Sequence, residues 1–307
     1  MQSLPIIDAH QHFWDLERNY LPWLCDEPPI PFRYGDYSAI RRTYLPKDYR
    51  HDSRDYRIVG TVYVETEWDP RTPVDETRWV HALADREGLP TVMVAQARLN
   101  QPDVEEVLAQ HSAFPRVRGI RHKPTSAPSP ADIDPGIPGS MGDPAWRRGY
   151  AQLAKYGLSF DLQTPWWHFE EAAELAADFP ETQIIINHTG LPADRSKEGL
   201  SGWRRAMQYV AAQPNVAIKI SGIGLPGQAW TADVNRDVVL ETIDIFGIDR
   251  CMFASNFPVD SLVAEFGTIF GGFMTITAEL SDSDQRKLFH DNAVAFYRMP
   301  TDTGMAE

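Results

Sequence analysis

Two histidines near the N-terminus, His10 and His12, directly follow a short apolar run. Side chains two residues apart on a strand point to the same side of the sheet, so the two imidazoles should project together from one strand end. Two imidazoles held this close can bind a divalent ion, polarise a carbonyl group or transfer protons near neutral pH. The pair alone also fits two strand-end histidines that only make hydrogen bonds.

Other side chains with useful chemistry also follow short apolar runs. They are Glu65, Glu67, Gln96, Arg98, Arg118, Arg121, His122, Lys123, Asp161, Gln163, Trp166, His188, Lys219, Ser221 and Asn256. Each is weak evidence alone: Glu65 and Lys219 could form an ion pair, and Trp166 could stack on a substrate ring or pack beneath a loop. Three histidines from two distant runs predict a functional site if the fold brings them together.

The elements that must position these residues follow a repeating pattern of an apolar run, a turn and an amphipathic segment. Eight runs are predicted as strands: 4–9, Ile58–Glu65, Thr91–Arg98, Val117–Arg121, Leu158–Gln163, Gln183–Asn187, Val216–Ile220 and Arg250–Ser255. Helices are predicted at Pro73–Glu87, Asp103–His111, Pro144–Lys155, His168–Asp178, Leu200–Ala212 and Val234–Phe246. A capping box at Ser281–Asp284 opens a last helix that ends near Tyr297.

Strands that alternate with helices of this length indicate parallel βαβ units. Eight units in 307 residues match a (β/α)8 TIM barrel, whose strands are continuously apolar because both faces are buried. A doubly wound open sheet is the alternative, but no glycine-rich phosphate turn follows the first strand. We therefore predict one barrel domain over residues 1–307, with the polar strand ends gathered at its C-terminal mouth.

Two irregular stretches follow strands, Asp15–Pro46 after the first and Pro124–Asp143 after the fourth. In a barrel both would rise over the C-terminal face, where active sites lie. Long loops there usually cover or wall a pocket. A disordered insertion remains the alternative for the second stretch.

Charge and composition exclude several partners. The formal net charge of −14 argues against nucleic acid and against an anionic membrane surface, since both require a basic face. No run approaches the roughly 20 apolar residues of a membrane span, and no basic region precedes an apolar one at the N-terminus. The two cysteines, Cys25 and Cys251, are not expected to pair. We expect a cytoplasmic protein, and whether it forms a homo-oligomer is left open.

Four motifs carry a resemblance to a known family: residues 7–15 (IDAHQHFWD), Val117–Arg121, Asn187–Gly190 and Met252–Val259. Together they resemble the amidohydrolase superfamily, in particular the branch of 2-pyrone-4,6-dicarboxylate lactonase, sugar-acid lactonases and sulfomuconolactone hydrolase. The similarity extends from about residue 5 to residue 298. In that family a strand-one histidine pair, a strand-six histidine and a strand-eight aspartate surround the reacting carbonyl. The resemblance therefore implies catalytic roles for His10, His12, His188 and position 256.

The chain departs from the family pattern at three places. Position 256 is asparagine, which cannot accept a proton as a general base. Gln163 stands where the strand-five metal histidine is expected, and Lys123 lies beyond the strand-four position of a carbamylated lysine. Only His10, His12 and His188 remain as metal ligands, although three histidines can hold zinc. Since the branch includes metal-independent members, we expect no obligatory metal, with a weakly bound zinc as the alternative.

The leading hypothesis is hydrolysis of a small anionic or polyhydroxylated lactone in carbohydrate or aromatic catabolism. The three histidines would polarise the carbonyl, and Asn256 would orient a water activated by His188, Asp260 or Glu65. Arg121, with Arg118 or Lys123, would hold a substrate carboxylate. Glu65, Gln163, Trp166 and Lys219 complete the expected substrate-binding set.

Two other hypotheses remain open at this point. The first is a decarboxylase, hydratase or lactone isomerase on the same scaffold, because loss of the aspartate suits such chemistry as well as hydrolysis. The second is a barrel that has lost its base and only binds a ligand. The retained histidines and arginines argue against this last possibility.

Overall fold

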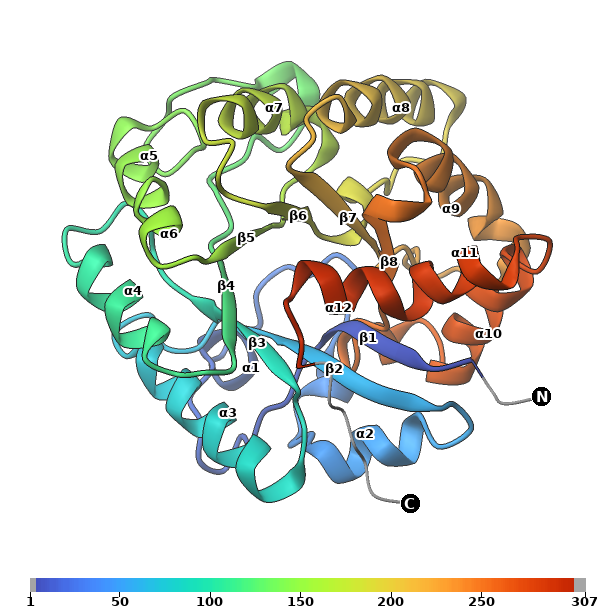
Figure 1. Cartoon of the computed structure of the whole chain (residues 1–307), viewed down its shortest axis with the longest axis horizontal. Coiled ribbons are helices and arrows are strands. Elements are labelled where there is room, and N and C mark those ends of the chain that lie inside the picture. Colours follow the sequence, from blue (N-terminus) through green and yellow to red (C-terminus); the bar gives the residue numbers. More distant parts are fainter. Residues whose placement is uncertain (1–3, 301–307) are drawn as a thin grey trace.

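The structure is a computed structural model that describes residues 4–300. Its strands form one parallel sheet in the order β1 to β8, rolled into a ring with helices around it (Figure 1). The strands are β1 (Ile6–Gln11), β2 (Ile58–Val64), β3 (Val92–Gln96), β4 (Val117–Arg121), β5 (Ser159–Leu162), β6 (Ile184–Ile186), β7 (Val216–Ile220) and β8 (Cys251–Phe253). The predicted TIM barrel and its eight strands are confirmed.

The helices follow the strands, and most of them lie on the outside of the ring (Figure 1). They are α1 (Pro22–Cys25), α2 (Pro46–Asp52), α3 (Pro73–Glu87), α4 (Val104–Ser112), α5 (Pro144–Tyr150), α6 (Gln152–Lys155), α7 (Phe169–Asp178), α8 (Lys197–Ala211), α9 (Ala232–Phe246), α10 (Phe266–Ile276), α11 (Asp282–Arg286) and α12 (Asn292–Phe296). Helix α3 has the bounds predicted from its proline start and glycine end. No helix among residues 4–300 is both long and apolar enough to cross a membrane.

Several details differ from the prediction, including the short helices α1 and α2, which were not predicted. The segment predicted as one helix at Pro144–Lys155 is divided into α5 and α6 at Ala151. The last helix is interrupted by a π-helical turn at Lys287–Asp291. Helix α10 was not predicted, because its sequence FGTIFGGFMTI is nearly all apolar and lacks the polar face that marks an amphipathic helix.

The ring closes between β1 and the segment after β8. The amide of His12 donates to the carbonyl of Phe257 at 2.8 Å, and the amide of Asn256 donates to the carbonyl of His10 at 2.8 Å. Below them, the Ser255 amide and hydroxyl donate to the buried Asp8 carboxylate at 2.8 and 2.6 Å. This seam places Asn256 beside the histidine pair, although the residues are about 250 positions apart in the chain.

The barrel interior contains a buried ion pair below the mouth. Lys219 on β7 donates to the Asp161 carboxylate on β5 at 2.6 Å, and both side chains are inaccessible to solvent. The hydroxyl of Tyr297, which follows α12, also donates to Asp161 at 2.9 Å. Helices α11 and α12 cross the near end of the ring in Figure 1. The pair therefore belongs to the packed interior, and the alternative of a Glu65–Lys219 ion pair does not occur, since Glu65 pairs with Arg121.

Candidate active site

A cavity of about 320 Å³ opens at the C-terminal mouth of the barrel. Strand-end residues His12, Arg121, Gln163, His188 and Asn256 line it. The long loop after β1 forms its outer wall with Trp14, Trp23, Ile30, Pro31, Phe32 and Arg33. Both parts of the predicted arrangement are thus present: polar strand ends meet at one mouth, and the first irregular stretch covers it.

His12 has a defined tautomer in its neutral form. Its Nδ1 lies 2.7 Å from the carbonyl oxygen of Val64, which can only accept a hydrogen bond. Nδ1 therefore carries the proton, and Nε2 of the neutral ring keeps a lone pair. Burial, with a further contribution from the positive Arg121, lowers the pKa of His12 to about 3. The ring is consequently neutral at physiological pH and offers Nε2 as a base.

Asn256 follows β8 in a left-handed backbone conformation, with φ +57°. Its Nδ2 donates to the carboxylate of Asp260 at 2.6 Å, which fixes the amide orientation. The other amide atom, Oδ1, consequently lies 3.3 Å from Nε2 of His12. Two acceptor atoms cannot bond each other, but one water molecule can donate a hydrogen to each of them. His12 and Asn256 therefore bring two hydrogen-bond acceptors side by side at the cavity.

His188 follows β6, also in a left-handed conformation, with φ +55°. Its Nδ1 lies 3.0 Å from the hydroxyl oxygen of Ser221 at the end of β7. Burial lowers the pKa of His188 well below its usual value, and the charges of Arg33, Arg121 and Lys219 lower it further. His188 is therefore a neutral hydrogen-bonding group rather than a cation.

His10 lies deeper than the other two histidines and does not line the cavity. Its ring centre is 5.0 Å from that of His12 and 4.6 Å from that of His188. Both of its ring nitrogens are buried, and neither has a hydrogen-bond partner within residues 4–300. The three histidines are brought together as predicted, but only His12 and His188 reach the cavity.

Arg121, at the end of β4, is held in place by residues that follow β2 and β5. Its Nε pairs with the Glu65 carboxylate, its Nη2 donates to the Glu65 carbonyl at 2.5 Å, and its Nη1 donates to Gln163 Oε1 at 3.0 Å. A guanidinium has five N–H groups, so two remain for a ligand. Glu65 also accepts from the amide of Glu67 at 2.6 Å. Glu65 therefore acts as the counter-ion of Arg121, behind the cavity wall, and not as a free base.

Three residues predicted for substrate binding lie away from the cavity. Arg118 points to the opposite end of β4, where its guanidinium donates to the carbonyls of Pro115 and Arg298. Trp166 packs over Gly202 of α8. Lys219 is enclosed in the barrel with Asp161. Arg118 is the second residue of β4, at the end away from the mouth. For Trp166 and Lys219 the predicted position was near the mouth end of a strand, but the direction or depth of the side chain was not predicted.

The loop after β1 contributes contacts that sequence reasoning missed. Arg33 donates to the carbonyl of Gly222 at 3.0 Å, and its guanidinium lies 3.4 Å from Asp260. The hydroxyl of Tyr34 donates to the same carboxylate at 3.0 Å. Burial raises the pKa of Asp260, while Arg33 opposes that shift. Asp260 thus links the covering loop to Asn256, and no signal in the loop sequence indicated this.

A buried carboxyl group behind the site gives a prediction on pH. Glu76 of α3 accepts hydrogen bonds from the Tyr63 hydroxyl and from the amide and hydroxyl of Thr66, all between 2.7 and 2.8 Å. Burial, and then the charge of Glu65, raises its pKa from 4.5 to about 7. The folded state therefore binds the extra proton between these two values, and stability should fall by about 3 kcal/mol as the pH rises from 4.5 through 7.

Glu76→Gln removes this titration, so we expect its unfolding free energy to exceed that of the wild type above pH 8. Urea denaturation at pH 6 and pH 9 measures the difference, with the exposed Glu174→Gln as control. Parallel pH profiles for wild type and Glu76→Gln would contradict this account.

The side chains at the mouth do not fit a divalent metal as they are arranged. Within residues 4–300 no group of three or more His, Cys, Asp or Glu side chains is placed to hold a metal ion. The strand-eight position supplies the neutral Asn256 where a carboxylate ligand would be needed. The positive charges that lower the pKa of His188 would also repel a dication.

The chain matches a protein family, and it is similar to known proteins in sequence and in structure. A family model described as Amidohydrolase matches residues 7–299. The chain is 44% identical to an uncharacterized protein of Sinorhizobium fredii, over 97% of this chain and all of the other. It is 28% identical to an L-fucono-1,5-lactonase of Burkholderia ambifaria, over 97% of each. An amidohydrolase structure from Burkholderia multivorans with bound zinc has a TM-score of 0.78 at 24% identity, covering 96% of this chain and 99% of that one.

Proposed function

The chain belongs to the amidohydrolase family, and on this premise we propose that it is a hydrolase that opens a lactone at the mouth of its barrel. The observation that carries the proposal is the pair of acceptors, His12 Nε2 and Asn256 Oδ1, 3.3 Å apart at the edge of the cavity. They suit a water molecule poised to attack a carbonyl carbon. The similarity to an L-fucono-1,5-lactonase supports a lactone as the group attacked.

His12 is the proposed general base. The water donates one hydrogen to His12 Nε2 and one to Asn256 Oδ1, which directs its lone pair towards the substrate. As the water oxygen bonds to the carbonyl carbon, its proton passes to Nε2. The new N–H then donates to Asn256 Oδ1, so the amide stabilises the protonated ring. Asn256 thus orients the water without accepting a proton itself.

His188 and Arg121 are the proposed donors to the oxyanion. We assign the Ser221 hydroxyl as the donor to His188 Nδ1, which leaves an N–H at Nε2 for the developing negative charge. The two N–H groups of Arg121 that the protein does not use add positive potential. When the tetrahedral intermediate collapses, the ring C–O bond breaks and the alkoxide takes the proton back from His12. His10, behind both rings, is proposed as a positioning residue.

The lining of the cavity favours a polar lactone. Arg33, Arg121 and Lys123 offer cationic donors, and Gln163 offers an amide. Trp14, Trp23 and Phe32 present an aromatic wall on the opposite, loop side. This combination suits a small ring that carries hydroxyl groups or a carboxylate.

The test is a panel of sugar-acid and carboxylated lactones, assayed by acid release with a pH indicator. We expect wild-type turnover of at least one lactone and a loss of about 10²–10³-fold in His188→Ala, the range for removal of one oxyanion donor. His51→Ala, at an exposed position on α2, is the control. Equal turnover by His188→Ala would end the proposal, and an unopened or decarboxylated product by NMR would favour the other enzymatic hypothesis.

Metal removal should have little effect. Because the cationic surroundings and Asn256 disfavour a dication, we expect dialysis against a chelator to change kcat/KM by less than twofold. Elemental analysis of the protein before and after dialysis gives the metal content of each sample. Loss of activity that added zinc restores would contradict this expectation.

A further inference from the structure

A second cavity, of about 610 Å³, adjoins the active-site cavity. The two share Trp23, Ile30, Glu67, Arg121 and Lys123 as lining residues. A site for a small ligand usually offers about 300–1,000 Å³, so the active-site cavity alone already suffices for one lactone ring. The larger neighbouring space is therefore available to a part of the substrate that does not react.

The charges around the second cavity balance one another. Three cationic side chains, Arg98, Arg121 and Lys123, face three acidic ones, Asp26, Glu65 and Glu67. Lys123 pairs with Glu67 on the shared wall, and Arg121 pairs with Glu65. Such pairs place a donor beside an acceptor, which matches a hydroxyl group because a hydroxyl both donates and accepts. A second anionic group would instead need an excess of positive charge.

His122 adds a neutral donor at this cavity. Its Nδ1 accepts from the amide of Leu99 at 3.1 Å and from the indole Nε1 of Trp146 at 3.0 Å. The ring proton is therefore on Nε2, for which no partner exists within residues 4–300. Burial lowers the pKa of His122 to about 4, so the ring stays uncharged at neutral pH.

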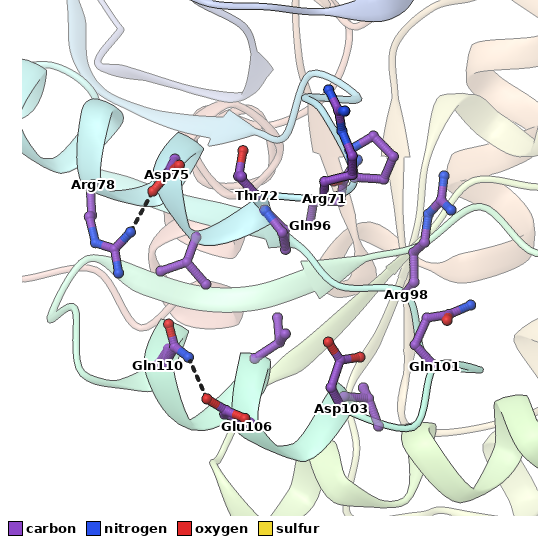
Figure 2. Close-up of a pocket in the computed structure, with 15 residues that line it drawn as sticks. Arg71, Thr72, Asp75, Arg78, Gln96, Arg98, Gln101, Asp103, Glu106 and Gln110 are labelled. Carbon is purple, nitrogen blue, oxygen red and sulfur yellow. Dashed lines mark hydrogen bonds and ion pairs between the residues drawn. The ribbon is translucent and has the colours of Figure 1, made fainter.

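Arg98 is a further hydrogen-bond donor that lines the second cavity. It lines both this cavity and a third one of about 430 Å³ between α3 and α4. Figure 2 shows Arg98 and Gln101 at one side of that third cavity, apart from the Asp75–Arg78 and Glu106–Gln110 pairs. No acidic side chain within residues 4–300 pairs with the Arg98 guanidinium. An exposed guanidinium without a partner is available to ligand oxygens.

We propose that the second cavity binds a glycosyl unit, so that the preferred substrate is the lactone of a glycosylated aldonic acid. The proposal rests on the proposed lactone hydrolysis and names its substrate class. A neutral ring with many hydroxyl groups matches the paired charges, the His122 donor and the amides of Asn100 and Gln101. Trp23, which lines both cavities and stacks on Phe32, adds aromatic contact surface next to the sugar.

The kinetic test compares matched lactones. D-glucono-1,5-lactone is the parent, and its 4-O- and 6-O-glycosyl derivatives, lactobiono- and melibiono-1,5-lactone, carry the additional sugar. We expect kcat/KM for at least one glycosylated lactone to exceed that of the parent at least tenfold. Arg98→Ala should reduce this ratio at least fivefold, whereas Arg205→Ala on the exposed face of α8 should not. D-glucaro-1,4-lactone carries a carboxylate instead of an additional sugar, so it tests whether the second cavity prefers an anionic group.

Binding of the stable acids separates this proposal from the proposed function. Calorimetry with lactobionate, melibionate and gluconate requires no turnover. We expect the wild type to bind a glycosylated acid more tightly than gluconate. In Arg98→Ala this difference in affinity should be lost. Lactone hydrolysis without any glycosyl preference in kinetics or binding overturns the second-cavity proposal alone. A preference for the glucarolactone over both glycosylated lactones also overturns it. Absence of hydrolysis together with selective binding of a glycosylated acid overturns the proposed reaction and supports the cavity.

Discussion

Replacing His12 with glutamine is expected to lower kcat by about 10²–10⁴-fold, the contribution usual for a positioned general base. The Val64 carbonyl fixes the imidazole through a 2.7 Å hydrogen bond from Nδ1, and Asn256 Oδ1 lies 3.3 Å from Nε2. Glutamine can keep a hydrogen bond to the Val64 carbonyl, but an amide cannot take a proton from water. The effect should therefore appear in kcat, while KM for the lactone changes little because the other cavity residues remain.

The pH profile of the wild type provides a second measurement on the same residue. A base works only when it is unprotonated, and the pKa of His12 is lowered to about 3 by burial. Activity should therefore persist down to about pH 4 and fall below it, unlike that of an enzyme whose histidine titrates near 6.5. His51→Gln, on an exposed part of α2, serves as the control for substitution. A His12→Gln enzyme with wild-type kcat would exclude this role.

Local sequence patterns predicted the barrel correctly. The alternation of apolar runs with amphipathic segments identified all eight strands, because a strand buried on both faces is apolar throughout. The same alternation predicted that His12, His188 and Asn256 would meet, since parallel strand ends share one edge of the sheet. These predictions depend only on which residues end a strand, and the sequence contains that information directly.

Side-chain direction and depth were harder to predict. Arg118 and Arg121 belong to the same short strand, yet Arg118 points to the base of the barrel and Arg121 to its mouth. Lys219 has a strand position like that of a mouth residue, but Asp161 and Tyr297 retain it in the interior. Both outcomes are set by partners from distant segments, and a single sequence does not reveal such pairings.

Most of the non-glycine residues with left-handed backbone conformations within residues 4–300 lie at the mouth. Glu67, His188, Thr189 and Asn256 all have φ between +55° and +57°, and each lies two or three residues after the end of a strand. Such conformations cost roughly 1–3 kcal/mol each in residues other than glycine and persist only when the surroundings enforce them. Their location indicates that the loops at the mouth are fixed in conformations that direct side chains towards the cavity.

Gly222, just after β7, makes this constraint testable. Its φ of +58° is left-handed, and a Cβ at this position would lie 2.5 Å from His188 Nδ1 and 2.9 Å from Arg33 Nη2. Gly222→Ala must therefore displace the His188 ring and break its contact with Ser221. Misplacement of a catalytic group by about 1 Å can cost about 10²-fold, so we expect kcat to fall at least that far.

Gly227 offers a matched control in the same loop, because its φ of +68° is also left-handed and a Cβ there would meet nothing within 4 Å. Both alanine variants should lose about 1–2 kcal/mol of stability from the backbone conformation alone, as thermal unfolding can measure. Only Gly222→Ala should also lose turnover, since only its methyl group reaches the imidazole. Equal kcat values for the two variants would mean that the position of the His188 ring does not limit the reaction, and the proposed oxyanion contact would then have to be abandoned.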